Sequence, residues 1–550
     1  MISKADSGRG PSESPERLPL EEVFVKRTIS AALFSLVALC GLWAVPEQKI
    51  VYAMPSEAET LDPSLNNFAQ ASIVLQNLFA GLYRMDKSGK PVPALASGFT
   101  LDSTKTVYTF TIKSTAKWSD GKPVTAQDFE YAWRRVLDPK TASRASSYLY
   151  CIKNAQAVNE GKADVSTLGV QALDTRTLRV TLENPIPYFL SLLFVSPFDP
   201  VRRDIVEGNP NWTKDPKTYV STGPFMLAEI RPKEKYVLKK NPYYVDAANV
   251  KLDTIEIVFI EAEESRLAAY LNNEIQVYDD PGLEAVKKFQ GTAEYKIFPR
   301  IGMSYYDFNC AKKPFDDARV RKAFALSINR AQIIKNIIQS TAKPAYGFVP
   351  YGIPDGVQTN KDYRAVVGDL IKEDPAEGRR LLADAGYPGG KGFPSVTLIC
   401  QANQIAKDVA QALQAMWKTN LGVSVDIQSY ETKAYWNELH QGNFDIGADS
   451  WTGYYPDPMA NLDIFETDKS RMDTFWSNKE YDALLKTNLK IIDQRVRMAN
   501  FAKAEKILVS EMPSMPIQYF QQALLCKPNV VGIGKSPFII HNFFEFASVN

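Results

Sequence analysis

The stretch YTFTIKSTAKWSDGKPVTAQDF, residues 108–129, places a strand, a turn and the start of a helix next to one another. Within residues 106–112, aromatic and aliphatic side chains alternate with threonines, which predicts a strand with one buried face. Residues 118–123 then form a turn around an Asp-Gly pair. Thr125 predicts a helix N-cap, because Asp128 three residues later can complete a capping box.

Further strands and helices are predicted on both sides of this stretch. Apolar spacing predicts further strands at residues 50–53, 178–182 and 255–260, and helices at residues 71–82, 317–337, 374–385, 406–420 and 498–511. No internal repeat, low-complexity tract or long linker separates these segments. The sequence therefore predicts a mixed α/β protein whose chain crosses between domains more than once.

Length and composition narrow the class of protein. The chain has 550 residues, more than one hydrophobic core usually holds, so two or three lobes are expected. Lys and Arg number 64 against 63 Asp and Glu, and this balance gives no support for a dedicated nucleic-acid binder. The only histidines are His440 and His541, so a His-rich zinc site is not expected.

No catalytic motif stands out in the sequence. The segment GIGKS, residues 532–536, lacks the first glycine of a phosphate-binding loop, because Asn529 occupies that position. The G-x-S-x-G and H-E-x-x-H motifs are absent, and no spacing selects a pair of carboxylates for acid–base chemistry. An enzyme is therefore not predicted. A hydrolase or a chaperone-like surface protein is the hypothesis from a different class.

The N-terminal segment resembles a secretory signal. Residues 28–44 are apolar and follow Lys26 and Arg27, and the run is short for a membrane span of about 20 residues. Its VALC sequence is similar to the end of a bacterial lipoprotein signal, which makes Cys40 a candidate for lipidation, although Leu39 stands where a small residue is usual. Cleavage a few residues later and an uncleaved anchor are the alternatives. The pairing of the other four cysteines stays open.

Blocks along most of the chain resemble one family, bacterial solute-binding protein family 5, which contains the substrate-binding proteins of peptide ABC importers. The most specific block is the opening stretch at residues 108–129. The others, in chain order, are DPKTAS at 138–143, SYL at 147–149, NPIPYF at 184–189, TGPF at 222–225, KNPYY at 240–244, KPFDDARVRKA at 313–323, ADAGY at 383–387 and Trp451 with YPDP at 455–458. The resemblance covers about residues 48–530.

This resemblance implies an α/β, two-lobed periplasmic-binding-protein fold with an extra third domain and a hinged ligand cleft. Carried over to this chain, it assigns residues 1–40 to the leader and signal segment, 41–79 with 206–302 and 521–550 to a discontinuous lobe I, 80–205 to the extra domain II, and 303–520 to lobe III. Closure of the lobes around a ligand is the expected motion.

The implied ligand site centres on Trp451. Family members that bind oligopeptides carry an Asp three residues after this Trp, and that Asp holds the peptide amine. The position is Tyr454 here, with Thr452 and Gly453 in between, and a family Arg shortly before the Trp falls at Ala448. Burying a charged amine needs a paired carboxylate, so these neutral residues argue against the usual grip on a free-amine peptide.

The remaining implied site residues come from other segments. A family Glu falls at Asn67, close to Ala69, and a late family Tyr falls at Phe520. Tyr148 and Tyr306 lie in or near family-like blocks and are candidates to line the site. Tyr306 equally fits an ordinary strand position.

Two aspartates could replace the missing carboxylate. Asp457 lies three residues beyond Tyr454, and Asp449 lies two residues before Trp451. Asp457 fits equally well as the cap of a helix starting near Pro458. Trp451 itself has a second interpretation as a core aromatic.

The sequence as a whole predicts an extracytoplasmic binding protein that does no chemistry and needs no cofactor or metal. It would capture oligopeptides in a closing cleft and deliver them to the membrane subunits of an ABC permease. We expect a monomer in the periplasm or at the outer face of the cytoplasmic membrane, held to the membrane surface if Cys40 is lipidated. The alternative is the same import role for a non-peptide or amine-blocked solute, because Tyr454 replaces the acidic amine anchor.

Overall fold

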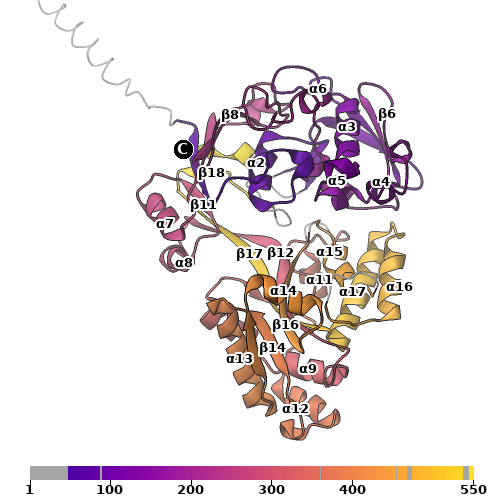
Figure 1. The fold of residues 1–550 in the computed structure, drawn as a ribbon, viewed down its shortest axis with the longest axis vertical. Coiled ribbons are helices and arrows are strands. Elements are labelled where there is room, and N and C mark those ends of the chain that lie inside the picture. The colour runs from indigo at the N-terminus through magenta and orange to yellow at the C-terminus, as the bar shows by residue number, and fades with distance from the viewer. Residues whose placement is uncertain (1–46, 87–89, 359–360, 454, 468–472, 537–543) are drawn as a thin grey trace, which may run out of the picture. The chain divides into compact units, whose positions relative to one another are not determined.

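The computed structural model describes residues 47–86, 90–358, 361–453, 455–467, 473–536 and 544–550 (Figure 1). Residues 48–550 form one compact unit. The predicted leader and signal segment, Cys40 and Tyr454 lie outside the described residues. Among the residues described, no helix has the length and hydropathy that a membrane crossing requires.

One large mixed sheet runs through this unit. Its strands are β1 Lys49–Met54, β8 Phe225–Arg231, β9 Lys235–Lys240, β10 Thr254–Phe259, β11 Val277–Asp279, β12 Tyr295–Phe308, β13 Lys343–Pro344, β14 Thr397–Gln401, β15 Asp426–Tyr430, β16 Ile446–Thr452 and β17 Ser514–Cys526. Their order is β15-β14-β16-β12-β17-β11-β1-β10-β9-β8, and β13 pairs with β17 as well. Strands distant in sequence therefore become neighbours.

The long strands β12 and β17 connect two halves of this sheet. One stretch of their antiparallel pairing joins residues 295–299 to 521–525, and a second joins residues 303–307 to 514–519. The register shifts between the two stretches, next to Phe520. On one side of the shift β17 pairs with β11, and on the other β12 pairs with β16 (Figure 1). The shift therefore marks the place where the chain crosses from one half-sheet to the other.

A separate four-stranded sheet contains the opening sequence stretch. It consists of β4 Ala96–Leu101, β5 Val107–Ile112, β6 Val170–Ala172 and β7 Thr177–Thr181, in the order β4-β5-β7-β6. Helix α3, Ala126–Leu137, follows the predicted turn and has the predicted capping box between Thr125 and Asp128. Two small pairs complete the strands: β2 Tyr83–Met85 with β3 Pro91–Pro93, and β18 Val530–Val531 with β19 Ser548–Val549.

Helices and short helical turns fill the segments between the strands. The α-helices are α2 Ala69–Leu78, α4 Ala155–Asn159, α5 Phe189–Leu192, α6 Arg203–Val206, α7 Glu263–Leu271, α8 Leu283–Phe289, α9 Ala318–Leu326, α10 Arg330–Gln332, α11 Tyr363–Val367, α12 Pro375–Asp384, α13 Gln404–Leu421, α14 Thr432–His440, α15 Met459–Leu462, α16 Lys479–Asn488 and α17 Gln494–Glu511. The 3₁₀ turns are η1 Pro63–Leu65, η2 Pro139–Thr141, η3 Ser146–Leu149, η4 Val165–Thr167, η5 Ser196–Phe198, η6 Ala247–Asn249, η8 Pro388–Gly390, η9 Asp463–Phe465 and η10 Phe544–Phe546, and η7 Ile333–Ile338 is a π-helical turn.

Most predicted elements are confirmed, but the helix predicted over residues 317–337 is wrong in its middle. The chain leaves the helix after α9 and restarts at Asn329, whose side chain accepts the Gln332 N–H at 2.9 Å. The break allows the buried Arg330 to donate to the Pro516 carbonyl at 2.7 Å and to pair with Glu373 at 3.3 Å. Tertiary contacts of one arginine therefore override the apolar periodicity.

Two large hydrophobic cores divide the described chain. The first core is built from residues 50–277 and 524–547, and the second mainly from residues 301–519. This division and the mixed α/β sheet are those expected of a two-lobed binding protein. The finer boundaries between lobe I, domain II and lobe III stay a prediction, and two of them, 302/303 and 520/521, fall beside the register shift of β12 and β17.

Candidate ligand-binding site

One cavity of about 550 Å³ lies between segments that pack on different cores. Its volume falls in the range of about 300–1,000 Å³ that is usual for small-molecule sites. We call its first wall the lining residues Asn67, Arg144, Ser147, Tyr148, Cys151, Tyr188 and Leu192, and its second wall the lining residues His440, Trp451 and Tyr455.

The first wall is built mainly on short turns that side-chain hydrogen bonds hold in place. Ser143 donates its hydroxyl to the Ser64 carbonyl at 2.7 Å and accepts the Ala145 N–H at 3.1 Å. These two contacts, both buried, fix the backbone on either side of Arg144. Turn η3 follows directly and carries Ser147 into the lining.

Asn67 reaches the cavity from a second fixed turn. The buried Asn66 donates its amide to Ser72 Oγ at 2.9 Å and to Ser196 Oγ at 2.6 Å, and its amide oxygen accepts the Phe68 N–H. An asparagine whose donors and acceptor are used in this way holds the loop before α2. The exposed Asn67 side chain therefore extends from a rigid support.

The second wall comes from one strand, its following loop and one helix end. Trp451 near the end of β16 donates its indole N–H to the Ala460 carbonyl at 2.6 Å, which fixes the plane of the ring. His440 ends α14, stacks on Trp436 and has its Nδ1 2.8 Å from the Asp473 carboxylate. Because Asp473 faces Nδ1, the opposite ring nitrogen is the one left for other contacts.

An aromatic stack joins the two walls. The rings of Tyr188 and Tyr455 lie parallel, with centroids 4.1 Å apart and planes at 4°. Tyr188 precedes α5 on the first wall, and Tyr455 lies in the loop between β16 and α15. Contacts of this kind contribute about 0.5–1.5 kcal/mol beyond the area that they bury.

The candidate carboxylate Asp457 is fully used by contacts within the protein. Arg497 of α17 binds both of its oxygens, with Nη1–Oδ2 and Nη2–Oδ1 distances of 2.6 and 3.0 Å. Asp457 Oδ1 also accepts the Met459 N–H at 3.0 Å, so the prediction that it caps a helix starting near Pro458 is confirmed. Both side chains of the ion pair are nearly inaccessible, and the charge of Asp457 is neutralised before any ligand arrives.

Asp449 lies two residues before Trp451 on β16 but is not among the lining residues. Its oxygens accept the Ser450 N–H at 2.6 Å and the Tyr305 hydroxyl at 3.2 Å. Burial raises the pKa of Asp449 to about 6, since no cation forms an ion pair with it in the described chain. Asp307 of the neighbouring β12 is completely buried, and burial likewise holds its pKa well above the usual range.

The structure brings three of the predicted site residues, Asn67, Tyr148 and Trp451, together in the cavity. Sequence reasoning missed the other lining residues, which are Arg144, Ser147, Cys151, Tyr188, Leu192, His440 and Tyr455. Most of them lie in or directly beside the family-like blocks quoted above. Their position next to these blocks is the sequence signal that could have predicted them, because none of these residue types marks a binding site by itself.

The remaining predicted residues lie around the cavity rather than in its lining. Tyr306 is buried on β12, and Gly453 is buried where an added side chain would contact Ala460 and Ile301. Thr452 and Phe520 both approach Gly302, and Arg300 lies over the Phe520 ring at 5.4 Å. Ala69 is the first residue of α2.

The cysteine in the lining is a protonated thiol. Cys151 donates its S–H to the Tyr148 carbonyl at 3.7 Å, and burial raises the pKa of its thiol to about 12, so the thiol stays protonated. Cys151, Cys310, Cys400 and Cys526 are all free. Within the described ranges, no group of His, Cys, Asp or Glu side chains is arranged to hold a metal ion.

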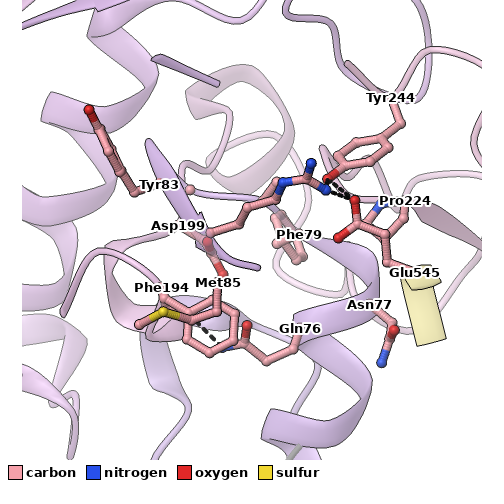
Figure 2. Close-up of a pocket in the computed structure, with 13 residues that line it drawn as sticks. Gln76, Asn77, Phe79, Tyr83, Met85, Phe194, Asp199, Pro224, Tyr244 and Glu545 are labelled. Atoms are coloured by element: carbon pink, nitrogen blue, oxygen red, sulfur yellow. Dashed lines mark hydrogen bonds and ion pairs between the residues drawn. The ribbon is translucent and has the colours of Figure 1, made fainter. Parts of the chain in front are cut away.

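A second cavity, of about 20 Å³, is too small for a ligand larger than a water molecule. Figure 2 shows Tyr244 beside Glu545 at its edge, with the Tyr244 hydroxyl 2.8 Å from the carboxylate. Arg84 pairs with Glu545 and with Asp246 at 2.8 Å, and burial holds the pKa of the lining Asp199 well above its usual range. This cavity belongs to the polar interior of the first core.

Three comparisons relate the chain to known proteins. It is 32% identical over 494 residues to the dipeptide-binding protein DppE of Bacillus subtilis, covering 89% of this chain and 90% of that one. It is 33% identical over 528 residues to the probable deoxycholate-binding periplasmic protein YgiS of Escherichia coli, covering 93% and 96%. The unliganded open form of the periplasmic murein tripeptide-binding protein MppA superposes with a TM-score of 0.80 at 31% identity, covering 92% and 98%.

The family model described as bacterial extracellular solute-binding proteins, family 5 Middle, matches residues 90–473. This range contains Arg144, Tyr188, His440 and Trp451, and so most of both walls. Its members bind solutes, the relatives above are named as binding proteins, and the MppA structure has the fold found here. The chain therefore belongs to the bacterial extracellular solute-binding proteins of family 5.

Proposed function

We propose that this protein captures peptides in the cavity between the two walls and delivers them to an ABC permease for import. The observation that carries the proposal is the cavity of about 550 Å³ whose walls pack on two different cores. A ligand held there contacts both lobes at once, so its binding energy favours the arrangement in which the walls face each other.

The lining suits ligands whose side chains vary. Trp451, Tyr148 and the Tyr188–Tyr455 pair present flat apolar surfaces, and Asn67 and Ser147 present small polar groups. Bridging water can connect such groups to different peptides without a fixed set of direct contacts. Main-chain N–H and C=O groups, which all peptides share, would then carry the common part of the affinity.

The crossing strands support the closing motion that such capture requires. Pairing of β12 with β17 is interrupted at residues 300–302, next to Phe520, and it shifts register once more between Ser304 and Tyr305. Each half-sheet keeps its own hydrogen bonds if the backbone bends there, so the motion costs few contacts.

Mass spectrometry of the ligands released when the purified protein is denatured tests the proposal. A population of short peptides supports it. A Ser147→Trp variant places an indole in the cavity and should lose the peptides, whereas Ser166→Trp, on the exposed turn η4, should retain them. Retention of peptides by the Ser147 variant would mean that they bind elsewhere.

A second candidate is a solute without a free amine. None of the described lining residues is an Asp or Glu, and Asp457 is held by Arg497. One relative is named for deoxycholate, which carries no amine, so a non-peptide solute is compatible with this fold. Recovery of a single non-peptide species, or only of amine-blocked peptides, would favour this candidate over general peptide capture.

The remaining parts of the proposal concern location. We propose that residues 1–40 direct export and that Cys40 takes a lipid that holds the mature monomer at the outer face of the cytoplasmic membrane. A Cys40→Ala variant should then move from the membrane fraction to the released fraction of the bacterium that makes it. Identical fractionation of the two forms would remove the anchor from the proposal and leave peptide capture unaffected.

A further inference from the structure

The charges of the lining are one-sided. Arg144 is its one permanently charged side chain among the described residues. No carboxylate in the described chain lines the cavity to balance it. A free-amine ligand entering this space would meet a cation rather than the carboxylate that it needs.

Arg144 is not used to hold the protein together. Within the described ranges its guanidinium makes no ion pair and no side-chain hydrogen bond, and the residue is exposed to the cavity. Its backbone is nevertheless fixed, because the flanking Ser143 and Ala145 are buried and hydrogen-bonded to each other. An arginine on a rigid turn with unused donors is suited to binding a carboxylate at two points.

Neighbouring lining groups add further donors. Ser147 lies in η3, three residues after Arg144, and Asn67 contributes an amide from the same wall. Across the cavity, Asp473 occupies Nδ1 of His440, which leaves its other ring nitrogen for a ligand. The set favours an acceptor-rich, negatively charged group over an ammonium group.

The acidic residues nearby do not cancel this preference at the lining. Arg497 neutralises Asp457, and Asp473 is hydrogen-bonded to His440. Asp449 is partly buried and does not line the cavity, and its oxygens accept hydrogen bonds from the Ser450 N–H and the Tyr305 hydroxyl. The cation on the first wall is therefore the charge that a ligand meets directly.

We propose that Arg144 makes this site selective for acidic peptides by binding a ligand carboxylate. The inference rests on the proposed peptide-binding function. The carboxylate can come from an acidic side chain or from the peptide C-terminus, and the two sources share the same chemistry at the guanidinium.

A pooled binding experiment tests this selectivity. The probe is an equimolar pool of synthetic peptides of three to five residues in which Glu and Gln alternate at each position, made as free acids and as C-terminal amides. Peptides retained by the protein are quantified by mass spectrometry. We expect Glu peptides, free acids or both to be enriched about 5- to 20-fold over their neutral counterparts, as for a charge-assisted contact that is partly exposed to water. Enrichment of Glu peptides over Gln peptides would identify an acidic side chain as the source of the carboxylate. Enrichment of free acids over amides would identify the C-terminus.

Three substitutions separate this contact from general effects of charge. Arg144→Gln should abolish the enrichment while neutral peptides stay bound. Arg179→Gln removes the same charge from the exposed face of β7, outside the cavity, and should leave the enrichment unchanged. Arg144→Glu should reverse the preference in a pool that alternates Lys and Gln. The enrichment in the unmodified protein should also fall as salt rises from about 0.05 to 0.5 M.

The outcomes also separate this inference from the function on which it rests. Peptides retained without regard to charge, or an enrichment that Arg144→Gln leaves intact, would overturn the role of Arg144 and keep peptide capture. An equal loss of acidic and neutral peptides in Arg144→Gln would show a steric role and overturn it too. If the unmodified protein retains no peptide at all, the proposed function fails together with the inference.

Discussion

The two walls of the cavity treat charge in opposite ways. On the first wall Arg144 is exposed and makes no ion pair in the described chain. On the second wall the nearby carboxylates do not line the cavity: Asp457 is bound by Arg497, Asp473 contacts His440, and the half-buried Asp449 accepts the Tyr305 hydroxyl. The difference shows that the acids serve the architecture of their wall, whereas the arginine is available to a ligand.

The same contrast explains why equal numbers of acids and bases say little about a binding site. The chain is nearly neutral overall. A charge that another protein group neutralises affects the free energy of folding, either favourably or unfavourably. A charge without such a partner is available to bind a ligand. Substitutions that change which charges are paired therefore test the comparison directly.

The largest effect is expected from breaking the Asp457–Arg497 pair. Arg497→Met leaves a buried carboxylate without a cation, and removing one partner of such a pair typically costs about 3–5 kcal/mol. We expect a matching loss in the free energy of unfolding, measured with urea. Arg495→Met on the same helix removes an exposed arginine and should change stability by less than about 0.5 kcal/mol. Similar values for the two variants would mean that the pair does not neutralise Asp457.

A smaller effect that depends on pH is expected at Asp449. Burial raises the pKa of this carboxyl to about 6 in the folded protein, above the value near 4 of an unfolded chain, so its ionisation destabilises the fold as pH rises through that interval. Asp449→Asn cannot ionise. It should match the unmodified protein at pH 4 and exceed it by about 1–2 kcal/mol above pH 7.

The control for this prediction is Asp426→Asn on β15, an exposed strand aspartate, which should show no such dependence. Unfolding free energies measured at several pH values between 4 and 8 provide the comparison. A constant difference between Asp449→Asn and the unmodified protein across this range would contradict the burial argument.

The smallest effect is expected from the aromatic contact between the walls. Tyr188→Ala and Tyr455→Ala should each destabilise the ligand-free protein, and the double variant should lose about 1 kcal/mol less than the sum of the two. Tyr150, whose hydroxyl binds Asn159 away from the cavity, supplies the comparison pair with Tyr455 and should give additive losses. Additive losses for Tyr188 and Tyr455 would show that the walls do not touch in solution.

Local sequence signals predicted the elements well where neighbouring residues decide the structure. The Thr125–Asp128 capping box and the cap at Asp457 both depend on residues two or three positions apart. The break between α9 and α10 depends on the contact of Arg330 with Pro516, far along the chain, and periodicity contains no information about it. Long-range polar contacts of this kind are the usual reason that a helix ends early.

The site was predictable only in part for the same reason. Trp451, Tyr148 and Asn67 were found because the family resemblance marks their positions. Arg144 was missed because an arginine in a turn is ordinary, and its role depends on having no acidic neighbour in three dimensions. The partner of Asp457 is likewise 40 residues away in sequence. Whether a charged side chain has a partner of opposite charge is therefore decided by the three-dimensional fold.

The central position of β17 has a consequence for how the protein is made. This strand pairs with β11 on one side and with β12 on the other, so it joins the two half-sheets, yet residues 514–526 are the last strand of this sheet in chain order. A ribosome has to synthesise every other strand of the sheet before β17 can complete it. Truncation before β17 would thus separate the two halves instead of merely shortening one of them.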